Sequence, residues 1–346
     1  MLVVGAGQAG LSAAYHLRRL DADFAVVDQA PGPGGAWQFR WPSLTMREVN
    51  GLHDLPGLAF ADTVPGNQTE VPAAQAVPRY YGAYEAKFDL RVQRPVRVRV
   101  VCDREPEFVV ETDHGDYRAR GLINATGTWE RPFVPHYPGA ESFAGRQLHT
   151  KDYRNAAEFA GAHVVVVGGG ISAVQLLDEI SHVTTTTWVT RTEPRFREEP
   201  FTPELGRRAV ALVEDRVRRG LPPGSVVSVT GLPVTDRIRA ARARGVLDRQ
   251  PMFQTIEPDG VRWADGRFQR AAVILWCTGF RSALDHLAPL HLRGPGGGIT
   301  MSGRLATQVA ANPRVHLLGY GPSASTIGAN RAGRAAVVEL LATLRD

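Results

Sequence analysis

The sequence predicts an α/β protein with two Rossmann-like dinucleotide-binding domains, the second inserted in the first. Two glycine-rich turns, Gly5-Ala6-Gly7-Gln8-Ala9-Gly10 and Gly168-Gly169-Gly170-Ile171-Ser172-Ala173, each follow an apolar segment and open a helical pattern. These two βαβ units are offset by 163 residues and form the internal repeat of the chain. Alternating segments between residues 96 and 119 predict a β-meander in the first domain.

The first unit is a complete βαβ motif. Strands are expected over Leu2–Val4 and Phe24–Val27, with a helix over Ala9–Leu20 between them. The segment Pro31–Pro78 is rich in Gly, Pro and Asn and lacks periodicity, so we expect an irregular excursion of the kind that covers a cofactor. A helix is expected over Tyr80–Phe88.

The meander is expected over Val96–Val101, Phe108–Thr112 and Tyr117–Ala119, because polar breaks separate these alternating segments. It leads into a strand that ends in Ala125-Thr126-Gly127. The second unit begins with the apolar run His163–Val167, which is typical of a parallel strand covered on both faces.

The helix of the second unit is expected over Ser172–Ile180 and its next strand over Thr186–Thr190. The region Arg195–Met252 has the weakest pattern of the chain. Val261–Arg267 resembles a hairpin, and Ala272–Thr278 a buried strand. The last segments are a strand over Val315–Leu318 and a helix over Thr326–Leu344. Because strands recur after Ala272, we expect the C-terminal part to return to the first sheet.

A charged residue of opposite sign follows each glycine turn at the same spacing. Asp28 lies 23 residues after Gly5, and Arg191 lies 23 residues after Gly168. In this fold the residue at the end of the second strand meets the adenosine ribose, where an acid suits a free 2′-hydroxyl and an arginine suits a 2′-phosphate. The chain is therefore expected to bind FAD in residues 1–155 and 271–346 and NADPH in residues 156–270. A protein that binds a flavin and its hydride donor is expected to be an oxidoreductase.

Composition excludes several other classes. The apolar fraction is 43% and the formal charge is +5, but the basic residues are almost all scattered arginines, so no nucleic-acid partner is expected. Cys102 and Cys277 are 175 residues apart, which excludes a local redox disulfide.

The sequence has no metal-ligand spacing, so no metal is expected. No apolar run is long enough for a membrane helix and no leader is apparent, so a cytoplasmic location is expected.

A family resemblance rests on a longer motif. The run Phe143-Ala144-Gly145-Arg146-Gln147-Leu148-His149-Thr150-Lys151-Asp152-Tyr153 matches Phe-x-Gly-x-x-x-His-x-x-x-Tyr and lies just before the second glycine turn. With Gly34-Gly35-Ala36-Trp37, the Thr-Gly exits Thr126-Gly127 and Thr278-Gly279, and the segment Gly319–Gly333, the chain resembles the flavin-containing monooxygenases over essentially its whole length. It looks most like the short bacterial single-chain members of this superfamily of FAD- and NADPH-dependent flavoproteins.

The glycine turns, the strand exits and the resemblance together predict the binding residues. For FAD these are Gly5, Gly7, Gln8, Ala9, Gly10, Asp28, Gly35, Trp37, Val96, Ala125, Thr126, Gly127, Gly319, Thr326 and Ile327. For NADPH they are Gly168, Gly169, Gly170, Ile171, Ser172, Ala173, Arg191, Thr278 and Gly279. No protein side chain stands out as catalytic, because the flavin carries the chemistry; His149 and Arg47 are weak candidates.

The resemblance implies that NADPH reduces the flavin, and that a flavin C4a-hydroperoxide then inserts one oxygen atom of O2 into a nucleophilic nitrogen or sulfur of a small molecule. Three alternatives stay open: a flavin reductase or NADPH oxidase that makes hydrogen peroxide or passes electrons to an acceptor, Baeyer–Villiger oxygenation of a ketone, and a non-catalytic redox sensor. Baeyer–Villiger relatives carry Trp where this chain has Tyr153-Arg154, which favours oxygenation of a heteroatom.

One departure from the family concerns an asparagine near the flavin. Family members often carry Asn shortly after a Ser-Leu pair, whereas Ser43-Leu44 is followed by Thr45-Met46-Arg47, and Asn50 comes three residues later. This departure favours the oxidase or reductase alternative. The sequence does not select a substrate, and it leaves the oligomeric state open, with a homodimer as one option.

Overall fold

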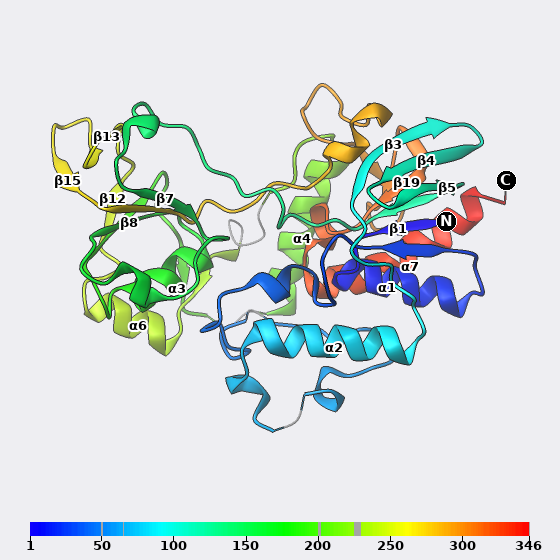
Figure 1. Ribbon diagram of the computed structural model, residues 1–346, viewed down its shortest axis with the longest axis horizontal. Coiled ribbons are helices and arrows are strands. Elements are labelled where there is room, and N and C mark those ends of the chain that lie inside the picture. Colours follow the sequence, from blue (N-terminus) through cyan, green and yellow to red (C-terminus); the bar gives the residue numbers. More distant parts are fainter. Residues whose placement is uncertain (50, 65, 200–201, 225–229, 346) are drawn as a thin grey trace. The chain divides into compact units, whose positions relative to one another are not determined.

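The computed structural model describes residues 1–49, 51–64, 66–199, 202–224 and 230–345. The chain divides into two units. The first unit comprises Met1–Glu130, Val210–Gly224 and Ser282–Asp346, and the second comprises Arg131–Ala209 and Ser225–Arg281. Each unit contains its own largely parallel sheet with helices packed on it (Figure 1), so the predicted α/β class with two Rossmann-like domains is confirmed.

The sheet of the first unit has six strands in the order β17-β18-β19-β6-β1-β2. Strands β2, β1, β6 and β19 are parallel neighbours, and β17 and β18 add an antiparallel edge. β19 pairs with β6, so the C-terminal part does return to the first sheet. The strands are β1 Leu2–Val4, β2 Ala25–Val27, β6 Leu122–Asn124, β17 Met301–Ser302, β18 Gln308–Val309 and β19 Asn312–Leu317.

Alternate residues of the short central strands face two different covering layers. Val3 and Ile123 belong to the apolar cluster formed with helices α1 Gln8–Arg19, α2 Ala73–Lys87 and α7 Thr326–Thr343. Leu2 and Leu122 belong instead to the cluster that includes the β-meander. Both faces of the sheet are therefore buried, which explains why these strands are continuous apolar runs (Figure 1).

The meander is confirmed as an antiparallel three-stranded sheet. It consists of β3 Val98–Arg104, β4 Glu107–Thr112 and β5 Gly115–Ala119. On β4 the side chains of Phe108 and Val110 face inward and are fully buried, whereas the next residue, Glu111, is exposed. The apolar side of the meander thus packs on one face of the main sheet, and its polar side faces solvent.

The irregular segment that we expected over Pro31–Pro78 ends earlier than predicted. It contains 3₁₀ turns at Gly35–Phe39, Phe60–Asp62 and Gln68–Glu70, but α2 begins already at Ala73 and carries Pro78 inside it. Pro78 is the sixth residue of α2, so it cannot supply the N–H that would bond to the Ala74 carbonyl, yet the helix continues through it to Lys87. We predicted the helix from Tyr80 because we took Pro78 as its boundary.

The second unit holds a five-stranded parallel sheet in the order β12-β9-β8-β16-β7. Helices α3 Ile171–Ile180 and α6 Asp236–Ala243 belong to this unit, as does a small antiparallel sheet of β13 Thr255–Glu257, β14 Gly260–Arg262 and β15 Phe268–Arg270. Val165 and Val167 pack in the cluster that contains Ile256 and Trp263. The main strands are β7 Arg146–His149, β8 Val164–Val167, β9 Thr186–Thr190, β12 Arg249–Pro251 and β16 Val273–Trp276.

The unit boundaries differ from those that the sequence predicted. β7 and β16 flank each other and β16 pairs with β8, so both strands belong to the second sheet, although we expected residues up to 155 and from 271 in the first domain. The patterns of both strands are those of any buried parallel strand, which does not reveal the sheet it joins. The expected hairpin after residue 260 is confirmed as β14 and β15.

The weakly patterned region 195–252 contains short elements. They are β10 Phe196–Arg197, α4 Pro203–Arg218, β11 Leu232–Pro233, α6 and β12. The end of α4 belongs to the first unit, where Val217 is fully buried. Further 3₁₀ turns lie at Ala140–Ser142, Ala156–Phe159, Asp285–Leu290 and Gly321–Ala324. Within the described residues, none of the helices combines the length and the apolar character that a membrane span requires.

A buried histidine in β19 makes the stability of the first unit depend on pH. His316 is fully buried, shares a hydrogen bond of 3.2 Å with the Thr307 hydroxyl, and burial lowers its pKa from 6.5 to about 4. The unfolded chain therefore binds more protons than the folded chain between pH 4 and 6.5. Stability is complete above this window and is lost as the pH falls through it.

We predict that the free energy of unfolding, measured with urea, falls between about pH 7 and about pH 5 by about 1 kcal/mol or more. The variant His316→Gln should be less stable at neutral pH but should lose less stability on acidification. An unchanged dependence on pH in this variant would show that other groups carry it, His16 and His286 being the next candidates because burial also lowers their pKa values to about 4.

Candidate cofactor sites

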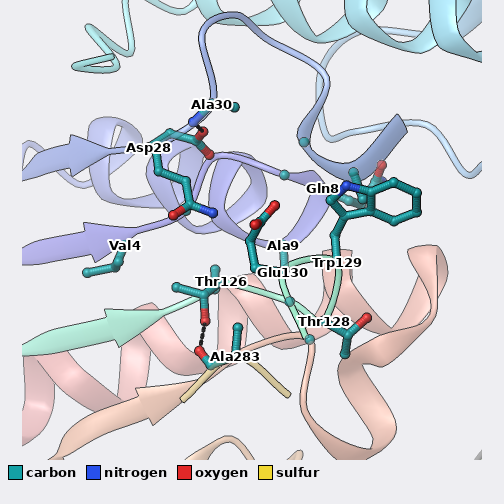
Figure 2. Close-up of a pocket in the computed structure, with 18 of the residues that line it drawn as sticks. Val4, Gln8, Ala9, Asp28, Ala30, Thr126, Thr128, Trp129, Glu130 and Ala283 are labelled. Atoms are coloured by element: carbon teal, nitrogen blue, oxygen red, sulfur yellow. Dashed lines mark hydrogen bonds between the residues drawn. The ribbon is translucent and has the colours of Figure 1, made fainter. Parts of the chain in front are cut away.

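The first unit contains a cavity of about 380 Å³ at the carboxyl ends of its parallel strands. Val4 at the end of β1, Val27 at the end of β2, Ala125 after β6 and Gly319 after β19 all line it. In open α/β sheets, ligands bind at this edge. Figure 2 shows labelled residues of the cavity, with Val4, Asp28 and Thr126 coming from neighbouring strand ends.

Most residues predicted to bind FAD line this cavity together. Two do not: Gly10 lies inside α1 and packs against the first turn, and Ile327 lies in the first turn of α7, where only the backbone is described. Those that line it are Gly5, Gly7, Gln8, Ala9, Asp28, Gly35, Trp37, Val96, Ala125, Thr126, Gly127, Gly319 and Thr326.

The glycines of the first turn have two different physical roles. A Cβ atom on Gly5 would lie 2.5 Å from the Ala125 carbonyl oxygen, and one on Gly10 would lie 1.8 Å from the Gly5 carbonyl oxygen. These two glycines therefore let the turn and helix approach β6 and each other. Around Gly7 and Gly127, by contrast, no atom lies within 4 Å of the position of a Cβ atom, and both residues line the cavity. Their missing side chains leave room for a ligand.

The carboxylate of Asp28 is held in place by the turn that it faces. Its two oxygens accept hydrogen bonds from the backbone N–H groups of Ala6 at 2.5 Å and Ala30 at 2.8 Å, and the side chain is buried (Figure 2). A carboxylate oxygen can accept more than one hydrogen bond, so the ribose hydroxyls of a dinucleotide can still bind. The geometry fits the ribose contact predicted from the sequence.

Two helices begin at this cavity. α1 follows Gly7 with no side-chain cap and no acidic residue in its first turn, so its first N–H groups and the positive end of its dipole suit a diphosphate. α7 begins at Thr326, and the Ser325 hydroxyl caps it by accepting a hydrogen bond from Gly328 N–H at 3.1 Å. Ser325 and Thr326 both line the cavity. The residues therefore fit a bound dinucleotide.

Several cavity residues have no signal in the sequence. His286 donates a hydrogen bond from Nε2–H to the Asn124 side-chain oxygen at 2.6 Å, and the Asn124 amide donates to Thr126 Oγ1 at 3.0 Å. Thr126 in turn donates to the Ala283 carbonyl at 2.7 Å (Figure 2). This chain of hydrogen bonds fixes the strand exit at Thr126, but it joins segments about 160 residues apart, so no motif reveals it.

The second glycine turn repeats the arrangement in the second unit. A Cβ atom on Gly168 would lie 2.2 Å from the Cys277 carbonyl oxygen, whereas no atom lies within 4 Å of such a position on Gly170. Ala173, which replaces the third glycine, is fully buried in α3. The strand ends, the turn and the helix thus offer the same open N–H groups as in the first unit. Gly169, Ile171 and Ser172 lie in the same turn and the start of α3.

Arg191 is exposed and directly follows β9. A second arginine lies beside this strand end: Arg249 of β12 donates hydrogen bonds to the Thr190 hydroxyl at 2.6 Å and to the Thr190 carbonyl at 3.2 Å. Sequence reasoning missed Arg249, since only the pairing of β12 with β9 brings it there. Thr278 and Gly279 follow β16, and the Thr278 hydroxyl donates to the Phe133 carbonyl.

The Phe-to-Tyr motif has a structural role within the second unit. Phe143 is buried in the apolar cluster, Gly145 passes where a Cβ atom would lie 2.4 Å from the Ala272 carbonyl oxygen, and Tyr153 stacks on Phe159. The contacts of Phe143 and Gly145 hold β7 beside β16, and the contact of Tyr153 holds the segment that follows β7.

His149 is buried, and both of its ring nitrogens have partners. Nε2–H donates to the Gly279 carbonyl at 2.9 Å, and Nδ1 accepts from Lys151 N–H at 3.1 Å. Burial lowers its pKa, so the ring is neutral. With no free lone pair, His149 holds the backbone after β16 and is not placed for proton transfer.

Arg47, the other weak catalytic candidate, lies on the surface. Its side chain is 67% exposed and forms an ion pair with Glu70. It is not among the residues that line the cavity. Asn50 lies outside the described residues.

Comparisons with known proteins agree with this site. Residues 2–226 match the family model described as pyridine nucleotide-disulphide oxidoreductase. The solved structure of a flavin-containing monooxygenase from Stenotrophomonas maltophilia is 38% identical, with a TM-score of 0.84 over 99% of this chain and 98% of that one.

Two curated relatives differ in the function that their names state. An uncharacterized CzcO-like oxidoreductase of Geobacillus kaustophilus is 27% identical over 85% of this chain and 87% of its own length. A Baeyer–Villiger monooxygenase of Streptomyces coelicolor is 27% identical over 74% of this chain and 47% of its own length.

The chain belongs to the pyridine nucleotide-disulphide oxidoreductase family and, within it, to the flavin-containing monooxygenases. It is a flavin-dependent oxidoreductase of the monooxygenase class, and the cofactors of this class are the FAD and NADPH predicted from the sequence. Cys102 is partly buried, Cys277 is buried, and both are free thiols.

The two roles of the glycines can be separated by a pair of variants. Gly10→Ala should lower the free energy of unfolding by about 3 kcal/mol or more, because the new methyl group collides with backbone. Gly7→Ala should leave stability nearly unchanged, since Gly7 has φ −79° and open space, but should weaken FAD binding about tenfold or more. Thermal unfolding of the apoprotein and flavin fluorescence titration measure the two effects. Equal FAD affinity in Gly7→Ala would contradict the placement of the diphosphate.

Proposed function

We propose that this enzyme uses NADPH and O2 to insert one oxygen atom into a nucleophilic nitrogen or sulfur of a small molecule. The observation that carries the proposal is the likeness over nearly the whole chain to a flavin-containing monooxygenase, together with two glycine turns followed by charges of opposite sign. Tyr153-Arg154 at the end of the Phe-to-Tyr motif supports a heteroatom as the site of oxygenation.

In this proposal the first unit binds FAD and the second binds NADPH. Bound FAD would supply the redox and oxygen chemistry. The chain's own residues bind and orient: the α1 N-terminus after Gly7 receives the diphosphate, and Asp28 receives the adenosine ribose. The start of α7 places a positive dipole end at the cavity, where it favours negative charge. In the second unit, Gly170 and the α3 N-terminus receive the diphosphate of NADPH.

A preference for NADPH over NADH is supported by the residues that follow β9. This chain has Arg191 and Thr192 directly after β9, in a turn that the Thr190 hydroxyl closes by donating to the Thr192 carbonyl at 2.8 Å. We infer that Arg191 faces the 2′-phosphate here.

Two other reactions are each favoured by one observation. An NADPH oxidase or flavin reductase is favoured by the lack of an asparagine after Ser43-Leu44, where Arg47 instead turns to Glu70 on the surface. Baeyer–Villiger oxygenation is favoured by the S. coelicolor relative. A measurement of products and stoichiometry separates these reactions from the proposed one.

For the purified enzyme supplied with NADPH and ¹⁸O2, we predict that at least one amine or sulfide of a substrate panel yields one labelled N- or S-oxide per NADPH consumed, with little hydrogen peroxide. Hydrogen peroxide equal to NADPH with every amine, sulfide and ketone would contradict the proposal and identify an oxidase. A labelled ester formed from a ketone, with no amine or sulfide product, would identify the Baeyer–Villiger reaction.

The role of Arg191 predicts a difference between two cofactors. Because a charged hydrogen bond to phosphate contributes about 1.5–3 kcal/mol, Arg191→Ala should weaken NADP⁺ binding about 10- to 100-fold and NAD⁺ binding less than about twofold. The measurement is calorimetric titration of the holoenzyme with each oxidised cofactor. Arg270→Ala, which removes an exposed arginine of the same unit, is the matched control. An equal loss with both cofactors would place Arg191 away from the 2′-phosphate.

A further inference from the structure

One arginine of the first unit is half-buried and has no acidic partner among the described residues. Arg40 lines the cavity directly after the 3₁₀ turn Gly35–Phe39. Its guanidinium carbon lies 4.8 Å from the ring centre of Trp129 and 5.6 Å from that of Trp37, so two indoles hold it by cation–π contacts. Its Nε is buried and has no hydrogen-bond partner among the described residues.

Without a bound ligand, the lack of an acidic partner makes the charged form of Arg40 unfavourable. Burial lowers the pKa of Arg40 from 12.5 to about 10, with no contribution from any neighbouring charge, so the side chain stays cationic at neutral pH. A buried cation without an acidic partner is normally balanced by another charge or replaced by an apolar residue. The indole faces offset only part of this desolvation.

The cavity has few cationic side chains to meet a negatively charged ligand. Among the described residues that line it, Arg40 is the one lysine or arginine, whereas Asp28 and Glu130 are acids. Arg94, which lies 3.9 Å from Asp28, is already paired to both carboxylate oxygens of Glu85 at 2.7 Å. A dinucleotide with two phosphate charges would therefore meet a single cation in this cavity.

The geometry of the preceding turn brings Arg40 toward the diphosphate site. A Cβ atom on Gly35 would lie 3.0 Å from Gly7 Cα, so the turn that begins at Gly35 lies against the open glycine of the first motif. The Gln38 side chain donates to the carbonyls of Gly32 at 3.1 Å and Gly35 at 3.1 Å, which fixes the turn that carries Arg40. Phe39 stacks on Trp129 at 6.2 Å and closes the aromatic layer.

We propose that Arg40 is the cationic contact for the diphosphate of FAD, held ready by Trp37 and Trp129 before the cofactor binds. The inference rests on the proposed binding of FAD in the first unit. Guanidinium groups suit phosphate because their N–H donors can form paired hydrogen bonds, and the two rings restrict the side chain beforehand. No sequence motif assigns this role to Arg40.

The test compares FAD with riboflavin, which has the same ring system and no phosphate. Arg40→Met keeps a long apolar side chain between the indoles and removes the charge. We expect the dissociation constant of FAD, measured with the apoprotein by flavin fluorescence, to rise about 10- to 100-fold in Arg40→Met, while that of riboflavin changes less than about twofold. Arg40→Lys, which keeps the charge but not the paired donors, should fall between wild type and Arg40→Met.

A matched control is Arg99→Gln, because Arg99 is an exposed arginine of β3 in the same unit. It should bind both flavins as the wild type does. Equal weakening of FAD and riboflavin by Arg40→Met would overturn the proposal, because it would show that Arg40 acts by packing. Unchanged FAD affinity would overturn it as well. If the wild-type apoprotein itself bound no FAD, the assignment of FAD to the first unit would fail instead.

Discussion

The close passage of a glycine turn over a neighbouring strand exit is the contact on which both sites depend. In the first unit Gly5 passes the Ala125 carbonyl, and in the second Gly168 passes the Cys277 carbonyl, each at a distance that admits no side chain. This approach sets the start of the following helix at the carboxyl edge of the sheet. The free N–H groups of α1 and α3 then face the space where a diphosphate fits. The open glycines Gly7 and Gly170 keep that space clear.

Charge then distinguishes the two sites that this shared backbone creates. Asp28 is fixed by two backbone N–H groups of its own turn, whereas Arg191 is exposed beside a second arginine, Arg249. The first unit adds a half-buried cation, Arg40, between two indoles. The protein residues thus supply binding and electrostatics, in keeping with an enzyme whose flavin performs the redox chemistry. His149 illustrates this division, because its two ring nitrogens bind backbone groups.

The sequence predicted the parts of the fold that depend on local patterns. Both βαβ units, the meander, the last helix and 13 of the 31 residues that line the cavity follow from the sequence. It failed where the outcome depends on pairing between distant segments. β16 could have joined either sheet, and the sequence pattern of a buried strand does not name its neighbours. The start of α2 was missed because Pro78 looks like a boundary, although the helix runs through it.

The unpredicted site residues share the same cause. His286, Asn124 and Arg249 reach their partners across about 60 to 160 residues of chain. Arg40 lies close in sequence to Trp37, but its isolation becomes visible only when Trp129 covers its other face. None of these features has a spacing rule that could reveal it beforehand.

We propose that one chain binds both a flavin and the nucleotide that reduces it. The most direct test of this proposal is an anaerobic titration of the purified protein with NADPH, followed by the absorbance of oxidised flavin. We expect one FAD per chain and complete loss of the oxidised flavin spectrum with about one equivalent of NADPH, without any other reductant. A protein that binds no flavin, or a bound flavin that stays oxidised in excess NADPH, would contradict it.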